Sequence, residues 1–307
     1  MLRIAHIVNP LIVTNPASDL NYAQPVTLKS MQLARERAMQ TSGIEVTQYA
    51  AFYEEDRRAV PVDFITTPVL ERSVLDYVKP TARVGGRKLP LLRDILDRLY
   101  ESAKYADYLI YSNIDIGLWP DFYLEVKRLI EEGTESFLIR RRNLSTEFTS
   151  PDELDKILKQ NGTPHNGYSC FVFPRAHYPG YVLDDTCIGL QPVSVTLTIN
   201  MIQRAVSFQN FSNVRLTFHI GDDSEWKQSL LDDCHLHNER ALDRVVHQLA
   251  ADGLLPYTAK VLELYQRKRS TYVIDNCSNR FSRTLYRAMR KFGFGDWVAA
   301  RYDNNRN

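Results

Sequence analysis

Two side chains with oxygen ligands, Asn113 and Asp115, follow the short apolar run at residues 108–111. That run has the composition of a buried parallel strand, so the polar residues after it are expected at the carboxyl edge of a sheet, where open α/β folds bind ligands. An amide and a carboxylate separated by one residue can both face a Mg²⁺ or Mn²⁺ ion whose remaining ligands are water and diphosphate oxygens. The same pair could instead cap the helix expected after Pro120 or fix a turn.

The hydrophobic pattern predicts the elements that must position this pair. Residues 3–8 and 44–50 are β-rich and flank a helical stretch at 26–40, which indicates a β-α-β unit with parallel strands and a right-handed crossover. Apolar residues at helical spacing predict a helix over residues 89–105, which leads directly into the run before Asn113.

The rest of the chain continues this α/β pattern. Helices are expected at residues 120–133, 150–160 and 192–208, and strands at residues 136–144, 170–173 and 213–223. From Ser229 onward the sequence is polar and mostly helical. We therefore predict a mostly parallel, Rossmann-type sheet flanked by helices in residues 1–228, and a helical C-terminal extension in residues 229–307.

The global properties exclude several classes of protein. The 38 Lys and Arg residues balance 37 Asp and Glu residues, so the chain has no strong electrostatic field that attracts nucleic acid. We therefore expect no nucleic-acid partner. The absence of G-x-G-x-x-G, G-x-x-x-x-G-K-[ST], G-x-S-x-G and H-E-x-x-H removes support for dinucleotide oxidoreductases, P-loop NTPases, α/β-hydrolases and zincins. The four cysteines form no C-x-x-C pair and the N-terminus reads as a strand rather than a signal peptide, so a cytoplasmic location is expected.

Residues 89–123 resemble the corresponding part of the GT-A nucleotide-sugar-dependent glycosyltransferases, in which a helix carrying donor-contacting residues leads into the strand that ends in a D-x-D metal motif. The resemblance extends to the N-terminal β-α-β unit and to the segments GYSCFVFPR and LTFHIGDDSEW, and so covers roughly residues 3–228. Asn113 stands at the first Asp of D-x-D, and Asp115 corresponds to the carboxylate that usually contacts the metal. The resemblance implies a GT-A-like fold and a divalent cation, Mn²⁺ or Mg²⁺.

The resemblance also suggests which residues bind the donor. The loop after the first strand holds the nucleoside in GT-A enzymes, and its candidates here are Asn9, Pro10 and Asn15, which could equally be ordinary turn residues. Basic residues before and in the expected helix at 89–105 could pair with a diphosphate. They are Arg87, Lys88 and Arg93, with Asp94 beside the last of them.

Three later residues complete the expected site. His219 ends an expected strand and matches the late histidine that often contacts the metal or the diphosphate in GT-A enzymes, although a histidine bonded to backbone would read in the same way. Asp184 and Asp185 are paired carboxylates in an expected loop. An inverting transfer needs one carboxylate to take the proton of the acceptor hydroxyl, so either is a candidate base, and the alternative is a solvated acidic pair.

Together these features predict a glycosyltransferase that moves a sugar from a nucleotide diphosphate donor, with UDP as the expected nucleotide, to a saccharide or another hydroxyl-bearing acceptor. One alternative is a nucleotidyltransferase, but the loop at residues 8–16 lacks the glycine-rich, basic sequence that this class normally shows. The other is a non-catalytic nucleotide- or sugar-binding module on the same fold, which the presence of Asn113 in the metal motif suggests.

Three charged or metal-like segments remain. The run Arg140–Arg142 could face phosphate, but a solvated run is expected. The sequence Cys-His-Leu-His at residues 234–237 has no second cluster at zinc spacing, so it is not expected to bind metal. Residues 282–302 combine an apolar stripe with basic residues, and docking on the catalytic domain or on a second subunit of a homo-oligomer is favoured over binding to an anionic membrane surface.

Overall fold

The computed structural model describes residues 1–79, 88–221 and 232–276. The chain forms two compact units, Met1–Gly253 and Leu254–Asn307, and the second contains helix α7 (Pro256–Asn276). No helix in the described part of the chain is long and apolar enough to cross a membrane. The boundary expected between residues 228 and 229, the basic segment at 282–302 and Arg87 all lie outside the described residues.

The first unit is built on one sheet that has nine strands among the described residues. The strands are β1 (Leu2–Val8), β2 (Ile44–Ala50), β3 (Ile65–Thr66), β4 (Tyr108–Ser112), β5 (Ile116–Leu118), β6 (Ser136–Leu144), β7 (Thr163–Pro174), β8 (Phe208–Phe211) and β9 (Thr217–Ile220). Their order is β3-β2-β1-β4-β7-β6-β9-β5, with β8 beside β6. Strands β3, β2, β1 and β4 run parallel, whereas β7 is antiparallel to both β4 and β6. The predicted α/β class with a mostly parallel sheet is confirmed.

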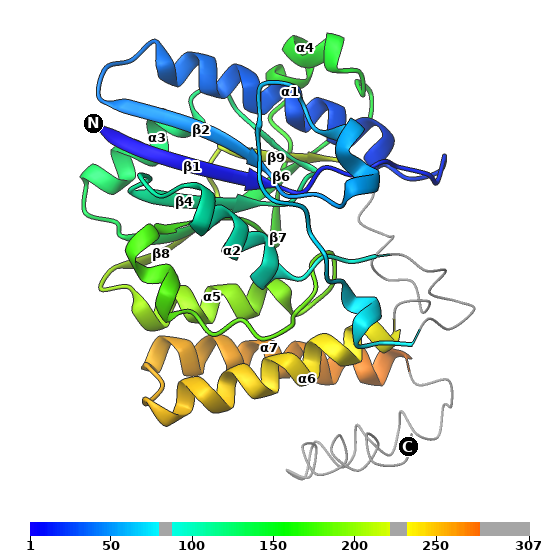
Figure 1. The fold of residues 1–307 in the computed structure, drawn as a ribbon, viewed down its shortest axis with the longest axis vertical. Coiled ribbons are helices and arrows are strands. Elements are labelled where there is room, and N and C mark those ends of the chain that lie inside the picture. The colour runs from blue at the N-terminus through cyan, green and yellow to red at the C-terminus, as the bar shows by residue number, and fades with distance from the viewer. Residues whose placement is uncertain (80–87, 222–231, 277–307) are drawn as a thin grey trace. The chain divides into compact units, whose positions relative to one another are not determined.

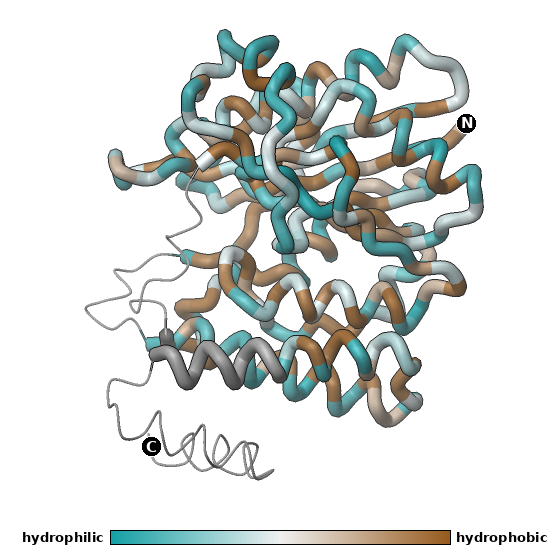
Figure 2. Tube along the Cα trace, turned by 180° about the vertical axis from the view of Figure 1, so that it is seen from behind, coloured by the Kyte–Doolittle hydropathy of each residue, from teal (hydrophilic) through white to brown (hydrophobic). Residues whose placement is uncertain are grey.

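Helices cover both faces of this sheet (Figure 1). The helices of the first unit are α1 (Leu20–Met39), α2 (Leu92–Ser102), α3 (Phe122–Glu131), α4 (Leu154–Lys159), α5 (Val193–Arg204) and α6 (Asp232–Ala251). Helices α1 and α3 bury their apolar residues against one face, and α2 and α5 bury theirs against the other. The strands carry long hydrophobic stretches, while the helices alternate between hydrophobic and hydrophilic residues (Figure 2), as expected for amphipathic helices that cover a buried sheet.

The predicted elements are present, with differences at their ends. Helix α1 begins earlier than expected, at Leu20, and Pro25 lies inside its second turn. The helix expected at residues 150–160 is a 3₁₀ turn followed by α4. Strand β7 is longer than the expected 170–173, because its first half is polar and partly exposed and therefore carries no apolar signal.

A buried polar network joins the strands that lead to the edge of the sheet. His6 of β1 is fully buried, and its Nδ1 lies 2.9 Å from the Tyr123 hydroxyl of α3 while its Nε2 lies 2.8 Å from Ser112 Oγ of β4. Gln48 Nε2 of β2 donates to the same Tyr123 hydroxyl at 3.1 Å. These contacts fit a neutral imidazole that accepts from Tyr123 and donates to Ser112. Burial lowers the pKa of His6 to about 3, so the ring stays neutral in the fold.

This network predicts a loss of stability in acid that depends on His6. The unfolded chain takes up a proton as the pH falls through about 6.5, while His6 in the folded chain does not until about pH 3. The free energy of unfolding therefore decreases as the pH is lowered through this range. One proton of difference corresponds to about 1.4 kcal/mol per pH unit. We expect His6→Gln to flatten the pH dependence of the free energy of unfolding between pH 6.5 and 4 in denaturant titrations. The exposed His247→Gln should keep the wild-type slope, and an unchanged slope in His6→Gln would contradict this assignment.

Candidate functional site

The segment after β4 places Asp115 beside His219. Strand β5 follows this segment and pairs antiparallel with β9, with Ile116 opposite His219. The pairing requires Gly117, because a Cβ atom there would clash with the ring of Phe218 in β9. As a result, His219 Nε2 lies 3.1 Å from Asp115 Oδ2, with the histidine 2% exposed and the carboxylate 24% exposed. The structure thus brings together the two residues predicted as metal ligands.

The Asp115 carboxylate is ionised and incompletely satisfied. Burial would raise its pKa, but the hydrogen bond and charge of His219, the charge of Arg141 and a hydrogen bond from its own backbone amide together outweigh burial, so the pKa lies below its ordinary value. Its Oδ1 is buried and meets no hydrogen-bond partner among the described residues. A buried, negatively charged oxygen without a donor is costly unless something else binds it. This oxygen is therefore the place in the site where a cation is favoured.

Asn113 lies two residues earlier and has a different set of contacts. Its Oδ1 accepts a hydrogen bond from the Tyr111 hydroxyl at 3.2 Å, and its backbone carbonyl accepts from the Ile116 amide at 3.1 Å. Residues 113–116 therefore form a turn, as the alternative interpretation expected. This turn places the Asp115 carboxylate beside His219. The capping alternative is wrong, because α3 begins at Phe122 after Asp121.

Arg141 lies close enough to Asp115 to affect its carboxylate, although the sequence analysis considered it only as part of the run Arg140–Arg142. It lies in β6, is 7% exposed, and donates from Nη1 to Ser169 Oγ at 3.2 Å and from Nε to Asn143 Oδ1 at 3.2 Å. The expectation of a solvated arginine run is wrong for this residue. Arg141 is buried whereas Arg140 and Arg142 are half-buried, in keeping with the usual alternation of side chains along a strand. That alternation is the signal that could have identified it.

A second cluster joins Asp94 and Asp185 through Arg72. Arg72 forms a two-pronged ion pair with Asp94, which lies in the first turn of α2. Arg72 Nη1 also donates to Asp185 Oδ1 at 3.2 Å and to the Tyr77 hydroxyl at 3.1 Å. Two predicted site residues are therefore held by an arginine that the sequence analysis did not single out. No local pattern could have found it, since the partners lie on three separate segments.

Asp184 is tied to helix α6. Arg244 donates from Nε and Nη2 to the two carboxylate oxygens of Asp184, both at 2.7 Å. Burial would raise the pKa of Asp184, but this pair and the backbone amide of Asp185 hold it below its ordinary value. His237 Nε2 lies 2.8 Å from the backbone carbonyl of Asp185. Both oxygens of Asp184 are thus occupied, which leaves Asp185 as the more available carboxylate.

The remaining predicted donor residues lie in the segment after β1 and near the start of α2. Asn9 is buried and donates from Nδ2 to the Ala51 carbonyl at 2.7 Å, beside buried Pro10. Asn15 is exposed, and its Oδ1 accepts from the Ala17 amide. Lys88 pairs with Glu55 at 2.5 Å, and Arg93 is exposed and lies 3.7 Å from Asp97 on α2. These four side chains make protein contacts of their own, and none of those contacts joins them to Asp115.

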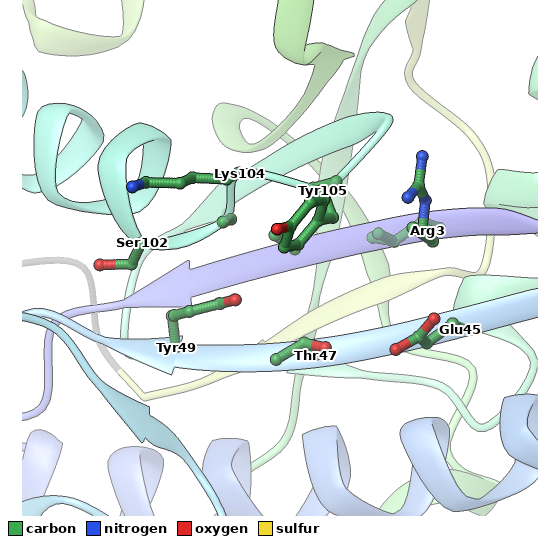
Figure 3. A pocket seen from close by; sticks show the side chains of 11 residues that line it. Arg3, Glu45, Thr47, Tyr49, Ser102, Lys104 and Tyr105 are labelled. Atoms are coloured by element: carbon green, nitrogen blue, oxygen red, sulfur yellow. The ribbon is translucent and has the colours of Figure 1, made fainter.

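A surface pocket lies elsewhere, at the amino-terminal halves of β1 and β2 and the end of α2 (Figure 3). Its lining includes Arg3, Glu45, Thr47, Lys104 and Tyr105. Because β1 and β4 run parallel, this pocket is at the opposite end of the strands from Asn113 and Asp115. It contains none of the predicted site residues.

Comparisons with known proteins concern the fold only. No family model and no curated protein matches the chain. A fragment of S. aureus TarS solved with UDP-GlcNAc is similar over 80% of this chain and 72% of its own, at 9% identity and a TM-score of 0.47, and the same fragment with UDP gives 80%, 71%, 10% and 0.42. The 4-diphosphocytidyl-2C-methyl-D-erythritol synthase of Anaerococcus prevotii is similar over 78% of this chain and 99% of its own, at 9% identity and a TM-score of 0.37.

The Asp184–Arg244 pair predicts a specific titration. The lowered pKa means that the pair contributes stability above the pKa of the unfolded chain, and that this contribution is lost as the pH falls through the folded pKa. We expect Arg244→Gln to raise the pKa of Asp184, measured by ¹³C NMR of the side-chain carboxyl. The exposed Arg240→Gln on the same helix is the charge-matched control and should leave the pKa unchanged. An equal shift of the Asp184 pKa in both variants would mean that the change in net charge causes it, and would contradict a direct effect of the Asp184–Arg244 pair.

Proposed function

We propose that this protein is a glycosyltransferase that moves a sugar from a nucleotide diphosphate donor, with UDP as the nucleotide, to the hydroxyl of a saccharide or another acceptor. A divalent cation at Asp115 and His219 would assist the reaction. One observation carries this proposal. At the carboxyl edge of the sheet, an ionised carboxylate keeps a buried oxygen for which the described residues offer no partner, beside a buried imidazole.

The residues present fit a cation that arrives with its substrate. Within the described ranges no group of three or more His, Cys, Asp and Glu side chains could hold a metal ion by itself. Mg²⁺ is commonly bound through only one or two carboxylates, with substrate phosphates and water filling the other positions. Asp115 and His219 supply two ligands of suitable chemistry, and a nucleoside diphosphate would supply others.

The proposed reaction has two parts, the departure of the nucleoside diphosphate and the attack of the acceptor hydroxyl. The bond between the anomeric carbon and the phosphate oxygen breaks, and negative charge develops on the departing nucleoside diphosphate. The cation, when bound, would neutralise that charge. Arg141 is a fixed positive charge in the same region, and its hydrogen bonds to Ser169 and Asn143 keep it oriented. It can therefore stabilise the leaving group without reorganising.

The acceptor hydroxyl must lose a proton as its oxygen bonds to the anomeric carbon. Asp185 is the candidate base, because both oxygens of Asp184 are engaged by Arg244. Arg72, which also donates to the Tyr77 hydroxyl, holds Asp185 near the first turn of α2, where it pairs with Asp94. A general base in this position would receive the acceptor proton in an inverting transfer.

The first test separates this proposal from its two alternatives. Calorimetric titration of UDP with and without Mn²⁺, followed by a hydrolysis screen over a panel of nucleotide sugars, should show metal-dependent binding and release of UDP from one donor. A nucleotidyltransferase would instead join a nucleoside triphosphate to a sugar phosphate and release pyrophosphate. A binding module would bind nucleotide or sugar without turnover of any donor.

Substitution of the metal ligands gives a prediction that does not need activity. Asp115→Ala should remove the Mn²⁺-dependent part of UDP affinity, a loss of at least about tenfold, equivalent to roughly 1.4 kcal/mol. Asn113→Asp should keep or tighten it, because a second carboxylate adds charge to a hard-cation site. Calorimetry measures both, with the exposed Asp121→Ala as control. The metal assignment fails if Asp115→Ala retains wild-type Mn²⁺-dependent affinity.

The base assignment predicts an effect on turnover alone. Asp185→Asn should lower transfer by a factor of about 10² to 10⁴, the usual range for a general base, and leave UDP affinity unchanged. Asp184→Asn should have a smaller effect, because Asp184 acts through its ion pair with Arg244. Steady-state kinetics of the two variants decide the question. Turnover that survives in Asp185→Asn assigns the role to Asp184 or to the substrate itself.

A further inference from the structure

Arg140 is a cationic side chain of the sheet that is held by several contacts. It lies in β6 next to the buried Arg141, with its guanidinium 5.1 Å from the centre of the Tyr168 ring in β7. Its Nε donates to Asn210 Oδ1 at 3.0 Å, and its Nη1 donates to Asn166 Oδ1 at 2.9 Å. Two neutral amides and an aromatic ring, contributed by β7 and β8, therefore fix the guanidinium plane.

No carboxylate compensates this charge within the described ranges. Neither Arg140 nor Arg142 has an acidic partner there, and Arg142 bonds only to the Asn161 and Gly162 carbonyls and to Asn213 Oδ1. Arg140 also keeps its Nη2 donors without a partner among these residues. A half-buried, oriented guanidinium with unused donors is suited to a two-pronged contact with an oxyanion.

The strand pairing places this group close to the candidate site. Ser112 at the end of β4 is opposite Cys170 of β7, which is opposite Ile139 of β6. Arg140 is therefore two strands away from Asn113, a distance of roughly 10 Å at the usual spacing between strands. Tyr168, under Arg140, packs on the same core as Tyr111 and Phe171, whose rings stack beside Asn113. Arg140 and Asn113 thus share the face that α2 and α5 cover.

We infer that Arg140, with the field of Arg142, binds an oxyanion carried by the acceptor, so that the acceptor is an acidic saccharide bearing a carboxylate or a phosphate. This inference rests on the proposed glycosyl transfer and names the acceptor class. The leaving diphosphate already has Arg141 and the Asp115–His219 position beside it. A second oxyanion site, separate from these residues, serves the other substrate. The amide groups of Asn166 and Asn210 add donors next to it for hydroxyl groups of the same molecule.

The test measures anion binding directly. The full chain, with Mg²⁺ and saturating UDP, is titrated with glucuronate, glucose 6-phosphate and neutral glucose, and the Nε–Hε signals of the arginines are followed by ¹⁵N NMR. The two acids should bind more tightly than glucose and shift the Arg140 signal. The tighter of the two acids identifies whether a carboxylate or a phosphate is preferred. Arg140→Gln should weaken the preferred acid about 10- to 100-fold, the range for charged hydrogen bonds.

Two variants supply the controls. Arg140→Lys keeps the charge but loses the planar donors, so it should bind with intermediate affinity. Arg128→Gln changes the net charge equally at an exposed residue paired with Glu125 and Glu132, and should bind as wild type. Equal binding of glucose and the acids, or equal losses in Arg128→Gln and Arg140→Gln, would overturn the inference. Anion binding without any detectable sugar transfer would instead count against the proposed function and leave the Arg140 site established.

Discussion

The contact between Asp115 and His219 depends on one long-range constraint, the antiparallel pairing of β5 with β9. These strands lie far apart in the sequence, and a three-residue strand contributes little pairing energy by itself. The pairing is stabilised by burial, since Phe218 packs against Trp119 with ring centroids 5.1 Å apart and covers Gly117. The contact between Asp115 and His219 therefore rests on apolar packing. Burial strengthens the hydrogen bond between them relative to water, and also makes an unsatisfied carboxylate oxygen costly.

The rest of the site is organised by arginines that join separate segments. Arg72 links the first turn of α2 to Asp185, and Arg244 links α6 to Asp184, so α6 contributes to the loop that carries both carboxylates. Asn238 of α6 extends this role, because its side-chain amide pairs with both the amide and the carbonyl of Cys187. These contacts fix the loop before any substrate binds, which lowers the ordering cost of reaching a reactive geometry.

The sequence was sufficient for features that depend on local periodicity. The β-α-β opening, the helix before β4 and the polar edge after residue 112 follow from alternation and helical spacing. The meeting of Asp115 with His219 was reached only through resemblance. Arg72 and Arg244 could not be selected, because their partners are set by strand order and helix packing rather than by neighbours in the chain. The antiparallel direction of β7 is likewise a property of the whole sheet.

The most direct test of the central claim is the position of the cation. A crystal of the protein grown with Mn²⁺ and UDP, measured at the manganese absorption edge, locates the ion by its anomalous signal. The account predicts a single strong peak within coordination distance of the Asp115 carboxylate and the His219 imidazole, with the diphosphate of UDP on its other side. A nucleotide bound at this edge without a manganese peak, or a peak bound by other residues, would contradict it.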